Sequence, residues 1–182
     1  MRKNIEKKIE IPEGIKCSYK DFVLTCTKDS SSLQRKISIP GVEVKIEKND
    51  ILLTAEKGNK NSYKKIVSSI AHIKNSFAGL QEQFVYNLEV VYIHFPISLK
   101  IEGGRLTVNN FFGEKKPRSA KILPNVEVEI TGQKIKISSA NKEAAGQTAA
   151  NFEKVTRVRR RDKRIYQDGI YIVEKPHGGK SG

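Results

Sequence analysis

The sequence predicts an α+β chain made of two tandem, duplicated domains, each with strand hairpins and one helix that packs on them. Three observations support this: an internal repeat at a spacing of about 84 residues, alternation of apolar and polar residues, and two segments with helical periodicity. We expect the first repeat at residues 1–88, the second at 89–175, and a flexible Gly-rich tail at 176–182. A chain of 182 residues can bury a core without disulfides or metals.

The repeat is visible when the sequence is shifted by 84 residues without gaps. The residues that then coincide are prolines and strand-forming residues: Pro12 with Pro96, Pro40 with Pro124, Val42 with Val126, Ile51 with Ile135, residues 22–25 with 106–109, and residues 85–88 with 169–172. One or two such matches arise by chance, but an ordered series along the chain does not. The chain is therefore two copies of one unit.

Residues 42–53 and 126–137 are the clearest strand segments. In both, apolar and polar residues alternate, as expected for a half-buried strand. An Asn-Asp step at 49–50 and a Thr-Gly-Gln sequence at 131–133 supply turn residues, so each segment is predicted to be a β-hairpin.

The first helix is expected to begin with Ser62 as its N-cap and to end before Gly79. Apolar residues recur every three or four positions and predict one buried face: Tyr63, Ile66, Val67, Ile70, Ile73 and Phe77.

The second helix is expected to start after Asn141, with a core face of Ala145, Ala149 and Phe152. If this helix continues far enough, three basic residues project from its other side: Lys154, Arg157 and Arg161. Gly146 costs about 1 kcal/mol against alanine in a helix, which indicates close approach by another backbone, of protein or RNA.

The last strand is expected at residues 170–172. Asp168 and Gly169 precede it and are interpreted as a turn. The tyrosines Tyr166 and Tyr171 could stack on bases, but aromatic residues near a sheet more often belong to the core. His94 is interpreted as a satisfied interdomain histidine rather than a catalytic one.

The sequence lacks the motifs of an enzyme or a membrane protein. Cys17 and Cys26 have no zinc-site spacing and are expected to be buried or half-buried thiols in strands. The three histidines share no metal-ligand spacing, and no cofactor-binding loop is present, so we expect no enzyme, metal or cofactor. No apolar run could span a membrane, and the N-terminus lacks a secretory signal, so we expect a cytosolic protein.

Positive charge is the strongest functional signal. The net charge is +14 and the isoelectric point is about 9.8, values typical of nucleic-acid binding. Residues 1–91 carry +5 and residues 92–182 carry +9. Seven of the eleven residues from Lys154 to Arg164 are Lys or Arg, and arginine suits bidentate phosphate contacts and stacking on bases.

Several strings together resemble one known family: residues 11–15 (IPEGI), 91–97 (VYIHFPI), 110–115 (NFFGEK) with Arg118, and 164–172 (RIYQDGIYI) with Lys175. Their order and distances are similar to those of the sixth large-subunit ribosomal protein ("L-six") family in its archaeal and eukaryotic branch. The resemblance covers essentially the whole chain. In two departures, Tyr166 stands where many members have Phe, and Lys154 where we expect a polar amide in some relatives.

The resemblance implies two α+β domains of one fold, each a small antiparallel sheet with a helix packed on it. It also implies a non-catalytic structural protein that binds large-subunit rRNA near the sarcin–ricin loop and the stalk base, beside the translation-factor site. The second domain would make most RNA contacts, and other ribosomal proteins would be neighbours. A small-molecule substrate is not expected.

Candidate RNA-binding residues follow from the charge pattern and the resemblance. They are Lys142, Gln147, Lys154, Arg157, Arg159, Arg160, Arg161, Lys163, Arg164, Tyr166, Lys175, Lys115, Lys116 and Arg118. The arginine cluster could instead be a solvated turn, and residues 110–118 could contact RNA, contact a neighbouring protein, or form an exposed hairpin tip. A free-standing RNA-binding module or RNA chaperone is the alternative function.

Overall fold

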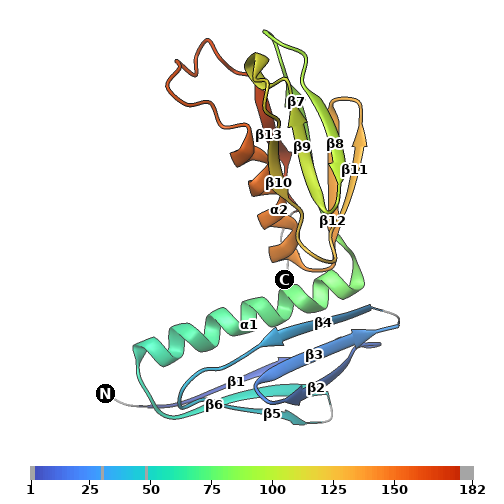
Figure 1. Ribbon diagram of the computed structural model, residues 1–182. Coiled ribbons are helices and arrows are strands. Elements are labelled where there is room, and N and C mark those ends of the chain that lie inside the picture. Colours follow the sequence, from blue (N-terminus) through green and yellow to red (C-terminus); the bar gives the residue numbers. More distant parts are fainter. Residues whose placement is uncertain (1–2, 30, 48, 177–182) are drawn as a thin grey trace. The chain divides into compact units, whose positions relative to one another are not determined.

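The computed structural model describes residues 3–29, 31–47 and 49–176. The chain divides into two compact units, Met1–Glu82 and Gln83–Gly182, which we call unit 1 and unit 2 (Figure 1). Most of the expected flexible tail, residues 177–182, lies outside the described residues.

Unit 1 contains strands followed by one helix. In chain order these are β1 (Lys3–Glu10), β2 (Lys16–Lys20), β3 (Val23–Lys28), β4 (Ser31–Lys36), β5 (Glu43–Glu47), β6 (Asp50–Gly58) and α1 (Lys60–Gln81). The described strands form two antiparallel sheets of three strands, in the orders β1-β6-β5 and β2-β3-β4. Helix α1 packs on strands of both sheets and closes a core that includes Ile51, Leu53, Ile66 and Ile73.

Unit 2 repeats this arrangement with one more strand. Its elements are β7 (Phe84–Val91), β8 (Ser98–Glu102), β9 (Arg105–Asn109), a 3-10 turn η1 (Phe111–Gly113), β10 (Arg118–Lys121), β11 (Glu127–Thr131), β12 (Lys134–Ser139), α2 (Lys142–Val155) and β13 (Gly169–Glu174). The described sheets have the orders β11-β12-β7-β13 and β10-β9-β8. Helix α2 contacts β7, β10, β12 and β13, and its face of Ala145, Ala149 and Phe152 is buried as predicted.

The predicted α+β duplication is confirmed, but the repeat is not free of gaps. The two hairpins have the same register, because Val44 pairs with Leu53 and Val128 with Ile137. In the other sheets the equivalent residues are 82 rather than 84 apart: Leu24 faces Tyr19 as Leu106 faces Ile101.

Strand β7 belongs to unit 2, beside β12 and β13. The expected boundary after residue 88 therefore falls inside this strand, and the compact units divide six residues earlier. The proposed match of residues 85–88 with 169–172 was wrong for the same reason: β7 takes the place in its sheet that β1 takes beside β6. The alternation of residues in β7 would fit a sheet of unit 1 or a sheet of unit 2. Its hydrogen-bonded pairing with β12 and β13 assigns it to unit 2.

Helix α1 differs from the expectation at both ends. Asn59 is the N-cap, and its side-chain oxygen accepts the backbone N–H of Ser62 at 2.8 Å. The helix continues through Gly79 to Gln81, because the residues around Gly79 still face the core. Tyr63 and Val67 were expected to be buried but are 47% and 42% exposed.

Helix α2 begins after Asn141 as predicted, and the side chain of Asn141 accepts the backbone N–H of Glu143 at 3.0 Å. A Cβ at Gly146 would lie 2.9 Å from the Tyr86 hydroxyl. The neighbour that this glycine accommodates is thus an aromatic side chain of β7, and not a backbone.

The cysteines are free thiols in strands, as expected. Cys17 is half-buried and Cys26 is buried, and their Sγ atoms lie 3.1 Å apart across the β2–β3 ladder. Within residues 3–29, 31–47 and 49–176, no cluster of ligating side chains could hold a metal ion.

Candidate nucleic-acid interface

Most of the basic cluster lies on a loop. Helix α2 ends at Val155, and residues 157–168, here called the basic loop, connect it to β13 (Figure 1). The helix therefore does not continue far enough to include Arg157 and Arg161, and of the three basic residues only Lys154 lies on it. A contact distant in sequence ends the helix: the Thr156 hydroxyl accepts the backbone N–H of Ile170 at 2.8 Å, which ties the last helical turn to the start of β13.

Asp168 fixes the far end of the basic loop. Its carboxylate accepts the backbone N–H groups of Ile93 and His94, each at 3.0 Å, and lies 2.7 Å from His94 Nδ1. Asp168 is almost fully buried, with 1% of its surface exposed. It was predicted to be a turn residue, but it joins the basic loop to the segment after β7. His94 is satisfied, as expected, but its partner lies in its own unit, so the expectation of an interdomain position was wrong.

Two opposing effects act on the pKa of Asp168. Burial alone raises it, but the hydrogen bonds from the His94 side chain and from the backbone of His94 and Ile93 outweigh burial. The pKa of Asp168 is therefore below its usual value, and at neutral pH the loop is fixed by a buried carboxylate anion.

A second segment lies against the basic loop. Residues 110–117, here called the aromatic loop, connect β9 to β10 and contain η1. The Arg161 guanidinium lies 4.9 Å from the ring centroid of Phe112 and 4.8 Å from that of Tyr166. Tyr166 also stacks on His94 with centroids 4.9 Å apart. Cation–π and ring contacts thus join the two loops into one surface.

Arg118 supports this surface from within the fold. Its guanidinium lies 4.3 Å from the Phe111 centroid, donates to Val155 O at 2.9 Å, and pairs with Glu114. The hydrogen bond from Arg118 lowers the pKa of Glu114, although burial partly opposes it. Arg118 therefore satisfies a carbonyl at the end of α2.

Arg164 also has an internal partner. Its guanidinium pairs with Asp162 at 2.8 Å, and this pair is exposed to solvent. The hydrogen bonds from Arg164 lower the pKa of Asp162. Among the basic residues of the loop, Arg161 and Arg164 are thus already engaged.

The remaining cations of this surface are exposed. Within the described part of the chain, no acidic side chain lies at ion-pair distance from them; they are Lys115, Lys116, Lys154, Arg157, Arg159, Arg160 and Lys163. Arg160 has a φ of +57°, the left-handed conformation of a tight turn. Seven cations without acidic partners on one surface form a region that suits a polyanion.

Three predicted residues lie away from this surface. Lys142 is in the first turn of α2, with its Nζ 5.4 Å from the Phe84 centroid. Gln147 donates to Asn151 at 2.9 Å, and Lys175 follows the far end of β13. The structure therefore brings together eleven of the fourteen predicted residues and separates Lys142, Gln147 and Lys175 from them.

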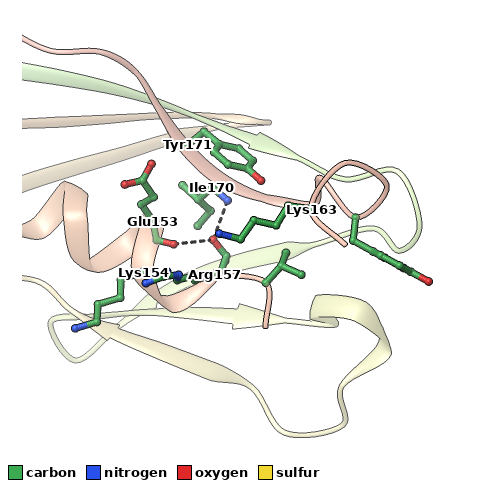
Figure 2. A pocket seen from close by; sticks show the side chains of 9 residues that line it. Glu153, Lys154, Arg157, Lys163, Ile170 and Tyr171 are labelled. Atoms are coloured by element: carbon green, nitrogen blue, oxygen red, sulfur yellow. Dashed lines mark hydrogen bonds between the residues drawn. The ribbon is translucent and has the colours of Figure 1, made fainter. Parts of the chain in front are cut away.

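A pocket of about 350 Å³ opens where α2, the basic loop and β13 meet (Figure 2). Its apolar lining is Val158 and Ile170, and its other lining residues are Thr156, Tyr166, Tyr171, Glu153, Lys154, Arg157 and Lys163. The sequence alone did not indicate the His94–Asp168 pair, because the two residues are 74 positions apart. It did not indicate the pocket either, because the pocket forms only when residues 153–171 fold back on themselves. The strings around residues 94 and 168 were informative only as family signatures.

Neither described helix combines the length and apolarity needed to cross a membrane.

Known proteins resemble this chain over nearly its whole length. A family model described as ribosomal protein L6 matches residues 95–169, a span that includes both loops. The large ribosomal subunit protein uL6 of Methanosarcina mazei is 41% identical over 175 residues, covering 96% of this chain and 99% of the relative. The proteins of the same name from Methanococcus vannielii and Methanocella arvoryzae are 38% and 36% identical, each covering at least 93% of both chains.

Proposed function

Because this chain belongs to the ribosomal protein L6 family, we propose that it is a non-catalytic, structural constituent of the large subunit of cytoplasmic ribosomes and binds large-subunit rRNA directly. The observation that carries the RNA-binding part is the surface formed by the basic and aromatic loops of unit 2. Seven of its cations are exposed and without acidic partners in the described structure, whereas Asp168, Arg118 and Thr156 hold the loops in place.

Phosphate contact is the binding mode that this surface favours. Guanidinium and ammonium groups need only charge and reach to contact phosphates, so they position a protein without reading base sequence. Helical RNA hides its base edges in a deep, narrow groove, so recognition depends on shape, phosphates and 2′-hydroxyls. We propose that Arg157, Arg159, Arg160 and Lys163 make these contacts, with Lys115 and Lys116 at the border.

The finer location rests on the family resemblance. We propose that unit 2 lies near the sarcin–ricin loop and the stalk base, beside the translation-factor site, with other large-subunit proteins as neighbours. Lys142, Gln147 and Lys175 lie apart from the loop surface and would bind a separate rRNA segment. Tyr166, covered by His94 and Arg161, would position Arg161 rather than stack on a base.

Quantitative mass spectrometry of large subunits washed in low and high salt tests the proposal. We expect about one copy of the chain per subunit, retained in the high-salt wash. Recovery mainly in the ribosome-free fraction would favour the alternative, a free-standing RNA-binding module.

A further inference from the structure

The pocket beside α2 has the size of a small-molecule site and not of an RNA helix. Its volume of about 350 Å³ lies at the lower end of the range of roughly 300–1,000 Å³ that is typical of such sites. The elements that line it are well anchored, because the Thr156–Ile170 hydrogen bond closes its base. A ligand of one or two rings therefore fits the space.

The interior of the pocket suits the flat face of a ring. Val158 and Ile170 are apolar and buried, and Tyr171 is 41% exposed. The polar groups of the lining are already used: the Thr156 hydroxyl accepts from Ile170, and the Tyr171 hydroxyl donates to Gln167 O at 2.9 Å. Such a surface can make apolar and π contacts with a ring, and its polar groups do not need hydrogen bonds from the ligand.

The border of the pocket suits phosphate. Lys154, Arg157 and Lys163 line it, and in Figure 2 the Lys163 side chain extends from the basic loop toward the end of α2. Glu153 lies beside Tyr171 and would repel a phosphate there, so phosphates would lie on the side of the three cations. A ring inside and an anion at the cationic border together describe a nucleotide.

We propose that this pocket receives one unpaired nucleotide that projects from an rRNA helix, with its base against Tyr171 and its flanking phosphates at Arg157 and Lys163. This inference rests on the proposed function and extends it. The cations of the basic and aromatic loops would bind the phosphates of a fully paired helix and of a bulged helix equally, whereas the pocket would distinguish the two. An unpaired base exposes the π face that a paired base hides. Because cations surround the border, we expect the bound nucleotide to be part of an RNA chain, which has a phosphate on each side, rather than a free mononucleotide.

The test uses the full-length chain and two RNA hairpins that differ by one bulged 2-aminopurine, a fluorescent base. We expect the bulged hairpin to bind roughly 5- to 100-fold more tightly than the paired one, as stacking of one base on an aromatic ring provides. We also expect 2-aminopurine fluorescence to be quenched on binding. Free 2-aminopurine riboside monophosphate should bind far more weakly than the bulged hairpin.

Tyr171→Ala should abolish both the preference and the quenching while affinity for the paired hairpin stays the same. Tyr171→Phe keeps the ring and should retain both. Tyr63→Ala, which removes a comparably exposed tyrosine from unit 1, is the matched control and should change nothing. Lys163 is at an exposed loop position, so Lys163→Ala should not disturb the fold. This variant should weaken binding of the bulged hairpin more than binding of the paired one.

Equal binding of the two hairpins, or a preference that persists in Tyr171→Ala, would overturn the inference and leave rRNA binding intact. Free nucleotide binding as tight as the bulged hairpin would also overturn it, by identifying a mononucleotide site. Failure of both hairpins and of native large-subunit rRNA to bind would instead contradict the proposed function.

Discussion

Units 1 and 2 have the same architecture but different connections. In unit 1, β3 ends at Lys28 and β4 begins at Ser31, and α1 is the last described element of the unit. In unit 2 the aromatic loop connects β9 to β10, and the basic loop connects α2 to the additional strand β13. Net charge hardly separates the units: unit 1 has 16 basic and 10 acidic residues (+6) and unit 2 has 18 and 10 (+8). The proposed function therefore assigns RNA binding to these loops of unit 2, and the common fold to the scaffold that holds them.

The largest effect on this comparison is expected from Asp168→Ala. The change removes a buried carboxylate that accepts from Ile93 and His94, so unit 2 should lose about 2–4 kcal/mol of stability. Hydrogen exchange measured by mass spectrometry should show faster exchange in unit 2 and unchanged exchange in unit 1. Asp162→Ala, which breaks an exposed pair, is the control and should have little effect. Equal loss of protection in the two units would contradict the assignment of Asp168 to unit 2 alone.

The same carboxylate predicts a pH dependence. Its pKa in the folded chain is below the unfolded value of about 3.9, so Asp168 stabilises unit 2 fully above that value. As the pH falls below about 4, through the lower folded pKa, this contribution should disappear. Urea titrations between pH 7 and 3 should show the stability difference between the wild type and Asp168→Ala shrinking toward acid pH. A difference that stays constant would contradict the account.

The smallest expected effects concern the feature that the units share. Asn59 and Asn141 each cap their helix through the side-chain oxygen, so Asn59→Ala and Asn141→Ala should each lower the free energy of unfolding by about 1 kcal/mol. Urea unfolding curves of the two variants check this, with Asn61→Ala, at an exposed position in the first turn of α1, as the control. A loss of unfolding free energy that is much larger for one variant than for the other would show that the two caps do not stabilise their helices equally.

The scaffold was more predictable from sequence than the loop surface. The hairpins at 42–53 and 126–137 and the buried face of α2 follow from local alternation and periodicity, and the structure confirms them. The end of α2 does not follow from local signals, because arginine is a good helix former and a run of arginines fits a helix or a loop. A distant hydrogen bond between Thr156 and Ile170 decides it.

The candidate site shows the same limit. Charge density identified the arginine cluster, but it could not separate Arg161, which lies over Phe112 and Tyr166, from Arg157, which has no acidic partner in the described structure. Similarly, Ser62 and Asn59 are both good capping residues, and the geometry of the first turn selects Asn59. The residue type shows which contacts a side chain can make, whereas the tertiary structure determines which of them it makes.

The salt dependence of rRNA binding tests the central claim most directly. The variant Arg157→Ala/Arg159→Ala/Arg160→Ala removes three loop cations, and Lys60→Ala/Lys64→Ala/Lys65→Ala removes the same charge from exposed positions on α1. Each phosphate contact contributes about 0.7–0.9 log units of affinity per log unit of salt, so the arginine variant should flatten the slope by roughly two to three units. The lysine variant should retain the wild-type slope. An unchanged slope in the arginine variant would show that these three arginines make no phosphate contacts, and equal flattening in both variants would show that total charge and not the basic loop binds the RNA.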